Sequence, residues 1–231
     1  MKDKTDSANS ITTVIGTSTG QHSGLLVDSG FDTRAEKPRL MLHSCCGPCS
    51  TAVIERLAGE FNITVFFYNP CITEEEEYRK RRQSQIKFIE LFNEERMHGL
   101  GGGIAVMDAD EVKFMEGPYN PGLFLELCIG HEEDPEGGDR CVICFRQRLE
   151  KTAEAAELAG CDFFGTTLTV SPHKNYKTIS EIGRELAVKY GLSFLDRDFK
   201  TQNGFKRTIE LSIKYGLYRQ DYCGCIFSKH K

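Results

Sequence analysis

The chain has 231 residues, of which 39% are hydrophobic and 27% are charged, a composition typical of a soluble globular protein. This length is sufficient for one domain with a buried core, and the absence of a long apolar run excludes a protein built on transmembrane helices. The formal net charge of −5 excludes a uniformly basic nucleic-acid-binding protein. The chain from residue 140 onward is nevertheless basic. It could present a cationic face to phosphates, or the charge could simply be spread unevenly along the sequence.

The first 37 residues differ in composition from the rest of the chain. They are rich in Ser, Thr, Gly and Asp, and we interpret residues 1–37 as a disordered N-terminal tail. They do not show the basic start, apolar stretch and cleavage site of a secretory signal, so we expect the protein to be cytoplasmic. Residues 38–231 are predicted to form a single α/β domain.

From residue 39 onward, predicted strands alternate with predicted helices. A buried strand at 39–43 leads into a helix that begins near Pro48, and a β-branched and aromatic strand at 63–68 precedes a helix that runs to about Arg96. A further strand is predicted at 104–107. Residues 108–139 are rich in Gly, Pro and acidic residues, which predicts a loop-rich insertion with a short helix near 123–127.

The second half continues the same alternation. A helix is predicted from near Cys141 to Gly160, a strand at 162–170, a helix that ends at Gly191, a short strand at 193–195 and a last helix that Gly216 ends. Such a pattern predicts a parallel sheet covered by helices on both faces. Ligands of these sheets bind at the carboxyl ends of the strands, so the loops that follow the strands are expected to share one functional edge.

Seven cysteines fall into three groups, and this is the strongest chemical signal in the chain. The groups are Cys45, Cys46 and Cys49; Cys141 and Cys144; and Cys223 and Cys225. Without a secretory signal, metal binding or catalysis is a better explanation than disulfides. The first two groups lie at predicted helix N-termini, where a thiol is more readily deprotonated, and clusters of thiolates alone select zinc or iron–sulfur centres.

Seven thiols are more than the four ligands that one zinc ion requires, which favours a cluster over a purely structural zinc site. Cys223 and Cys225 are interpreted either as further ligands or as a redox-active pair, because a disulfide across one residue is strained and easily reduced. The remaining cysteines stand alone and are interpreted as core residues without a chemical role: Cys71, Cys128 and Cys161.

Several other side chains follow predicted strands or lie near the C-terminus. His173 and Lys174 are candidates for contact with phosphate or a nucleotide, although they could equally belong to a solvated loop. Asp198 could be a proton donor, a metal ligand or a capping residue. The segment with Tyr218, Arg219 and Tyr222 combines aromatic rings with a cation, as in contacts to single-stranded nucleic acids, but terminal packing explains it equally well.

Five motifs together resemble the QueH family of epoxyqueuosine reductases, over about residues 38–228. They are His43-Ser-Cys-Cys-Gly-Pro-Cys-Ser50, Phe67-Tyr-Asn-Pro70, Glu136-Gly-Gly-Asp-Arg-Cys-Val-Ile-Cys-Phe145, Thr166-Thr-Leu-Thr-Val-Ser-Pro-His-Lys174 and the segment from Gly216 to Ser228. The resemblance implies a Rossmann-like fold of the HUP type. It also implies the last step of queuosine biosynthesis, in which an epoxide on a wobble nucleoside in the tRNA anticodon loop is reduced to an alkene without cobalamin.

The resemblance further implies a [4Fe–4S] cluster with a second metal, iron, close by. We expect Cys45, Cys46, Cys141 and Cys144 to hold the cluster and the second metal to share two of them. Cys49 occupies the region where some family members have an aspartate ligand, and Cys49 and Asp198 are the candidate catalytic residues. The tRNA would contact Phe145, His173, Lys174, Tyr218, Arg219 and Tyr222, and an electron donor is required as a further partner.

Two alternatives belong to other classes of protein. An ATP-dependent tRNA-modifying enzyme of the PP-loop type shares the predicted sheet, but it needs a Gly-rich phosphate loop after the first strand. Here Ser44-Cys-Cys-Gly-Pro-Cys49 takes that place, which argues against ATP. A non-catalytic RNA-binding module with a zinc site predicts a colourless protein that contains zinc alone.

Overall fold

The computed structural model describes residues 36–99 and 109–229. Most of the predicted tail, residues 1–35, and the strand predicted at 104–107 therefore lie outside the described residues. From Glu36 onward the chain forms one compact unit, and all of the structure below belongs to it.

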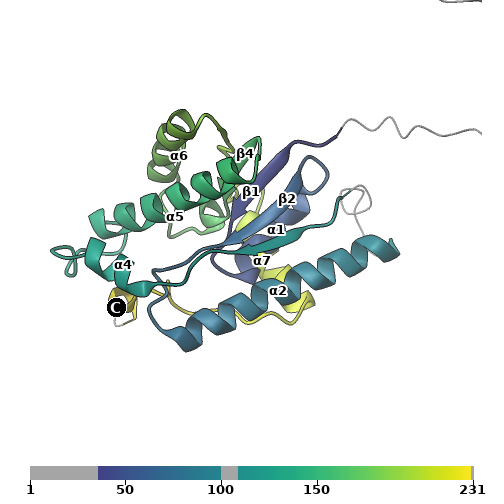
Figure 1. The fold of residues 1–231 in the computed structure, drawn as a ribbon. Helices are drawn as coiled ribbons and strands as arrows, with labels where there is room; N and C mark the ends of the chain where they lie inside the picture. Colours follow the sequence, from purple (N-terminus) through teal and green to yellow (C-terminus); the bar gives the residue numbers. More distant parts are fainter. Residues whose placement is uncertain (1–35, 100–108, 230–231) are drawn as a thin grey trace, which may run out of the picture. The chain divides into compact units, whose positions relative to one another are not determined.

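A parallel sheet of five strands in the order β3-β2-β1-β4-β5 organises the described residues (Figure 1). The strands are β1 (Arg39–His43), β2 (Asn62–Phe67), β3 (Lys113–Glu116), β4 (Phe163–Thr166) and β5 (Ser193–Phe194). The order reverses between β1 and β4, which pair in register with Leu40 opposite Phe163. Open α/β sheets bind their ligands at such a point, next to the carboxyl ends of the central strands.

Helices cover both faces of the sheet, as Figure 1 shows. α1 (Gly47–Leu57), α2 (Glu75–His98) and α7 (Gly204–Lys214) lie on one side, and α5 (Asp139–Leu158) and α6 (Tyr176–Tyr190) lie on the other. Alternate side chains of β1 serve the two layers: Leu40 and Leu42 pack with α1 and α2, whereas Met41 packs with α5 and α6. The predicted Rossmann-like fold with a parallel sheet and helices on both faces is confirmed.

Two elements differ from the sequence prediction. β3 lies within the segment predicted to be loop-rich. The sequence does not reveal this edge strand, because Phe114 is its one partly buried apolar residue and the strand depends on pairing with β2. The strand predicted at 162–170 ends at Thr166, where the Thr166 hydroxyl accepts a hydrogen bond from the Leu168 amide over 3.1 Å. A short 3-10 helix (Leu168–Val170) follows, so the chain turns away directly beside the end of β1. The short helix predicted near 123–127 is present as α4 (Pro121–Leu127).

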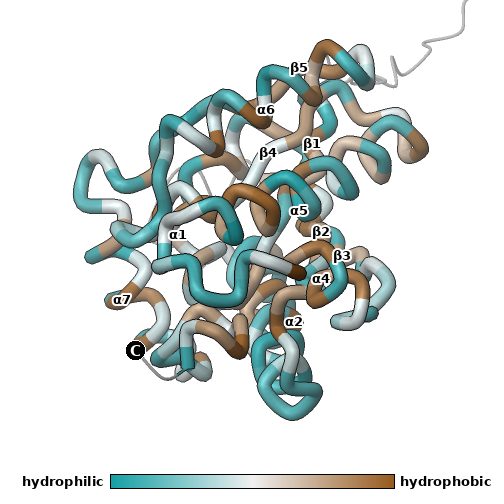
Figure 2. Tube along the Cα trace, turned by 90° about the vertical axis from the view of Figure 1, so that its left-hand side faces the viewer, coloured by the Kyte–Doolittle hydropathy of each residue, from teal (hydrophilic) through white to brown (hydrophobic). Residues whose placement is uncertain are grey.

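Close contact between α1 and α2 requires a glycine at the start of α1. A Cβ atom on Gly47 would lie 2.5 Å from the backbone oxygen of Ser84 in α2. Much of α2 is hydrophilic (Figure 2), consistent with a helix that packs only one face against the core. Among the helices in the described part of the chain, none has the length and apolarity needed to cross a membrane.

Candidate metal centre and substrate cavity

The first cysteine group surrounds the N-terminus of α1. Cys46 is the N-cap residue, with extended backbone angles, and Cys49 lies in the first helical turn. The three sulfur atoms of Cys45, Cys46 and Cys49 all lie within 4.8 Å of one another. The β1–α1 turn therefore brings the three thiols to one point at the carboxyl edge of the sheet. Three sulfur atoms at this spacing can bind one soft metal ion or a corner of a cluster.

Hydrogen bonds distribute the protons unequally among these thiols. Those from Cys45 and Cys49 lower the pKa of Cys46, and the positive charge of Arg81 acts in the same direction. Hydrogen bonds with Cys45 and Cys46, together with burial, raise the pKa of Cys49. The side-chain amide of Gln220 also donates to the Cys46 sulfur over 3.1 Å. The group is thus built to hold negative charge at Cys46, and thiolate is the form that binds metal.

The second cysteine group lies in the first turns of α5. The Cys141 sulfur accepts a hydrogen bond from the Gly137 amide over 3.3 Å and is partly exposed. Cys144 is buried, and its thiol interacts by a hydrogen bond with the thiol of Cys71, a residue that sequence analysis interpreted as a core thiol. Cys71 and Cys144 also share a hydrophobic cluster with Cys128 and Cys225. All ten cysteines of the chain are free thiols.

Arg148 is a buried cation shared by several of these thiols. Only 2% of its surface is exposed, and its Nε atom donates to the Cys144 carbonyl over 3.2 Å. Its charge interacts with Cys144, Cys71 and Cys45. The Nη2 atom has no hydrogen-bond partner among the described residues, although it is buried. A buried guanidinium group with an unsatisfied donor indicates that an anion belongs beside it.

A second buried guanidinium group, that of Arg81, holds the C-terminal segment against the first cysteine group. Arg81 pairs with Glu77 over 2.6 Å and donates hydrogen bonds to the carbonyl oxygens of Tyr222 and Cys223, each over 3.0 Å. Gly224 lies directly against this guanidinium group. It has a φ of +99°, and a Cβ atom there would lie 3.1 Å from the nitrogens of Arg81. Glycine at this position therefore sets the path of the Cys223-Gly224-Cys225 segment.

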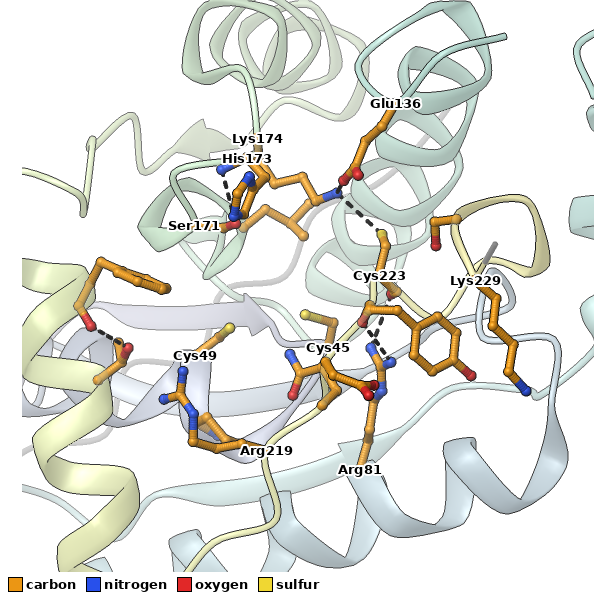
Figure 3. Close-up of a pocket in the computed structure, with 18 of the residues that line it drawn as sticks. Cys45, Cys49, Arg81, Glu136, Ser171, His173, Lys174, Arg219, Cys223 and Lys229 are labelled. Atoms are coloured by element: carbon orange, nitrogen blue, oxygen red, sulfur yellow. Dashed lines mark hydrogen bonds and ion pairs between the residues drawn. The ribbon is translucent and has the colours of Figure 1, made fainter. Parts of the chain in front are cut away.

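A cavity of about 600 Å³ opens beside these groups. Figure 3 shows Cys45 and Cys49 next to each other on one side of it, with Lys174 and Cys223 on another. Its lining carries five basic side chains, Arg81, Arg148, Lys174, Arg219 and Lys229, against the carboxylates Glu136 and Asp221. The cavity is therefore electropositive, and its volume is in the range expected for a ligand of nucleoside size.

Lys174 reaches into this cavity between an acid and a thiol (Figure 3). Its ammonium group donates to Glu136 over 3.0 Å and to the sulfur of Cys223 over 3.2 Å. Burial by itself would lower the pKa of Lys174, but the negative charges of Cys223 and Glu136 outweigh this effect and raise the pKa. Lys174 therefore stays protonated at neutral pH and holds a fixed positive charge at the Cys223 sulfur.

The structure brings some of the predicted substrate residues to the cavity and not others. His173, Lys174, Arg219 and Tyr222 contribute to the lining. Phe145 does not, because its ring is buried in the core between β1, α5 and α6. The Tyr218 hydroxyl instead donates to Glu77 over 2.7 Å, outside the lining.

Asp198 and Cys225 also lie outside the lining, as do the predicted cluster ligands Cys46, Cys141 and Cys144. Asp198 accepts a hydrogen bond from the Lys200 amide over 3.1 Å, as a residue that caps a turn does. Cys225 is buried behind Cys223 in the cluster of Cys71 and Cys144. The catalytic role of Asp198 and the role of Cys225 stay predictions.

His43 is a neutral structural residue of the same edge. Burial lowers its pKa to about 4, and the charge of Arg148 acts in the same direction. Because the Tyr68 carbonyl can only accept, Nε2 of His43 donates to it over 3.2 Å, and Nδ1 accepts from the Thr166 hydroxyl over 3.0 Å. His43 thus ties the carboxyl ends of β1, β2 and β4 together.

Sequence reasoning missed Arg81, Arg148 and Gln220. Arg148 follows Cys141 and Cys144 at the spacing i, i+3, i+7, which places all three on one helix face. That spacing was a usable signal. Arg81 lies in a run of charged residues that is typical of a solvated helix surface, and no sequence motif marks Gln220 as a site residue. Only the fold shows that these polar groups surround the thiols.

Comparison with known sequences identifies the family of this chain. A family model described as "Epoxyqueuosine reductase QueH" matches residues 40–231. An epoxyqueuosine reductase QueH from Streptococcus pyogenes serotype M1 is 38% identical over 198 residues, which cover 86% of this chain and 73% of the relative. One from Thermotoga maritima is 32% identical over 190 residues, covering 82% of this chain and 89% of the relative. Because these matches span most of both sequences, the chain belongs to the QueH family of epoxyqueuosine reductases, a family of oxidoreductases.

Proposed function

We propose that this protein reduces the epoxide of epoxyqueuosine in the anticodon loop of a tRNA to the alkene of queuosine. The reaction takes up two electrons and two protons, breaks both C–O bonds of the epoxide, forms a C=C bond and releases the oxygen as water. The observation that carries the proposal is the grouping of Cys45, Cys46 and Cys49 at the edge of an electropositive cavity of nucleoside size. Redox chemistry at thiolates and a polyanionic substrate are both compatible with that site.

The side chains present fit an iron–sulfur centre with an adjacent metal. The donor set consists of thiols, the buried Arg81 and Arg148 can offset negative charge, and the unpaired Nη2 of Arg148 is available to an anion. We assign Cys45, Cys46, Cys141 and Cys144 to a [4Fe–4S] cluster, and Cys49 to a second metal, iron, that shares two of the cluster thiolates. When bound, these groups supply single electrons at low potential and a Lewis acid for the epoxide oxygen.

The cavity lining suggests how the substrate is held. A base that is flipped out of the anticodon loop can enter a cavity of about 600 Å³, whereas the phosphates stay outside near Arg219, Lys229 and His173. Tyr222 lines the cavity, with Arg81 5.4 Å and Lys229 5.9 Å from the centroid of its ring. Because an aromatic ring can stack on a base, Tyr222 is our candidate for this contact. The unpaired Oε1 of Gln220 offers an acceptor to the substrate from the same wall.

Lys174 and Cys223 contribute a further part of the lining. The Lys174 ammonium group offers a fixed positive charge to the cavity, and Glu136 holds it in place. Cys223 faces the cavity and Cys225 lies behind it, which is compatible with a metal ligand and with a pair that passes electrons from the donor. We expect the reaction to take place in the cytoplasm, where an unidentified one-electron donor would supply the electrons.

The proposal is tested with protein purified and reconstituted without oxygen. Iron and acid-labile sulfide are measured first, and tRNA that carries epoxyqueuosine is then incubated with the protein and dithionite, digested and analysed by mass spectrometry of its nucleosides. We expect bound iron and sulfide in similar amounts and conversion to queuosine. Cys45→Ala should abolish both, whereas Cys161→Ala, which removes a thiol from the core away from the site, should abolish neither. Iron-loaded protein that leaves epoxyqueuosine unchanged would refute the proposal.

A further inference from the structure

Cys71 lies at the carboxyl end of β2, next to the loop that carries the first cysteine group. The side-chain amide of Asn69 donates to the Ser44 carbonyl over 2.9 Å and ties the two loops together. The Asn69 carbonyl also accepts from the Ile72 amide over 3.1 Å, which closes a turn around Cys71. Only 1% of the surface of Cys71 is exposed. The backbone on both sides of this thiol is thus held at the same edge of the sheet as Cys45.

The thiol of Cys71 faces a second thiol and not only apolar neighbours. It packs in one buried cluster with Cys144 of α5, and the two thiols interact with each other. Cys45 is close enough for its charge to act on Cys71. Cys71 therefore interacts with one thiol from each of the two cysteine groups that we assign to the cluster. Cys128 belongs to the same hydrophobic cluster but has no such thiol partner.

The buried cation provides an independent observation. Arg148 interacts electrostatically with Cys144, Cys71 and Cys45, and its buried Nη2 atom lacks a hydrogen-bond acceptor among the residues that the structure describes. Neutral thiols do not compensate a buried positive charge, because only the deprotonated forms carry the opposite charge. Metal binding deprotonates thiols and would leave thiolates beside this guanidinium group.

We propose that Cys71 is a metal ligand, and that Cys71 and Cys144 together hold one thiophilic metal ion, iron or zinc. Cys144 would then be shared between this ion and the cluster. The inference rests on the proposed function, because the cluster supplies the shared thiolate. It adds a sixth thiol to the five already assigned to the centre, and it gives Arg148 a further anionic neighbour besides Cys144 and Cys45.

The test compares Cys71→Ser and Cys71→Ala with Cys128→Ala, a variant that removes a thiol from the same hydrophobic cluster. Anaerobically reconstituted proteins are analysed for iron and sulfide. Both Cys71 variants should lose roughly one iron per chain or more relative to wild type, as expected when a metal loses a thiolate ligand. Cys128→Ala should keep the wild-type iron content. Thermal midpoints of the metal-free proteins show whether all three variants fold.

A second measurement uses cobalt(II) alone as the probe, added to metal-free reduced protein. The intensity of the sulfur-to-cobalt charge-transfer absorption rises with the number of thiolate ligands, so it should fall in both Cys71 variants and not in Cys128→Ala. Equal iron content and equal cobalt absorption in the Cys71 and Cys128 variants would overturn the inference and leave the proposed function intact. A wild-type protein without sulfide or activity defeats the proposed function instead, and the cobalt result then decides the role of Cys71 separately.

Discussion

The ammonium group of Lys174 donates a hydrogen bond to the sulfur of Cys223 over 3.2 Å and so joins the loop after β4 to the Cys-x-Cys segment near the C-terminus. These residues are 49 positions apart in the sequence. Glu136, from the segment before α5, holds the same ammonium group from another side over 3.0 Å. Three loops that carry no common sequence pattern therefore meet at one buried positive charge.

Removal of this charge should impair the reaction. Lys174→Met is expected to lower kcat/KM for tRNA carrying epoxyqueuosine by about tenfold or more, because a hydrogen bond that involves a charged group contributes about 1.5–3 kcal/mol. The control is Lys177→Met, which removes an exposed lysine that lies 4.0 Å from Glu181. Single-turnover rates with excess reduced enzyme provide the measurement. Equal losses in the two variants would show that the contact with Cys223 has no role in the reaction.

Loss of the guanidinium group of Arg148 should alter the metal centre itself. A positive charge near a cluster favours its reduced form, so Arg148→Met is expected to lower the reduction potential by about 60 mV, which corresponds to a tenfold change for one electron. Iron content should also fall. Arg146→Met is the matched control, because Arg146 is two residues away and pairs with Glu185 on the surface. A potential that moves equally in both variants, or in neither, contradicts the assignment of Arg148 to the centre.

Two ion pairs in α2 have the same spacing but should differ in their effect on stability. Glu77–Arg81 is buried, whereas Glu75–Arg79 is exposed. Arg81→Met leaves the Glu77 carboxylate buried without its cation and should lower the free energy of unfolding by about 3–5 kcal/mol. Arg79→Met should change it by less than about 0.5 kcal/mol.

Urea unfolding of the metal-free proteins provides the comparison for these pairs. The double variant Glu77→Gln/Arg81→Met should recover part of the loss, since it no longer buries an unpaired charge. If the double variant is less stable than Arg81→Met alone, the loss of stability has another origin, such as the Tyr222 and Cys223 carbonyls, which no longer accept hydrogen bonds from Arg81.

Asp196 should make stability depend on pH in the acid range. Its carboxylate accepts hydrogen bonds from Tyr176, Ser180 and Arg184, each over 2.8 Å. Burial opposes these contacts, but together they lower its pKa below the ordinary value of 3.8. Since the folded state binds this proton less readily than the unfolded state, the contribution of Asp196 is present above pH 3.8 and is lost as the pH falls through the folded-state pKa.

Asp196→Asn should therefore be less stable than wild type at neutral pH, and the difference should narrow as the pH falls below 3.8. Urea midpoints of the metal-free proteins at several pH values measure this directly. A difference that stays constant down to pH 2 would mean that the carboxylate is not the titrating group.

Local patterns predicted the sheet and the main thiol groups well. Buried strands such as β1 and β2 show continuous apolar runs, and the cysteine groups are visible as short motifs. β3 was not predicted, because an edge strand with largely exposed side chains carries little periodic signal. Phe145, a predicted contact of the tRNA, lies instead in the core, in one buried cluster with Met41 and Leu149 and outside the cavity lining.

The sequence by itself determined the chemistry of the site, because residue types and spacings establish that thiols follow the strands and begin the helices. The tertiary structure alone decided which thiols and cations meet. Arg81 and Arg148 lie on helices whose charged residues resemble solvated surfaces, yet 1% and 2% of their surfaces are exposed. Cys71 resembles an ordinary core residue until β2 and α5 bring it to Cys144. These contacts join segments far apart in the chain, and no short-range pattern encodes the packing of two helices across a sheet.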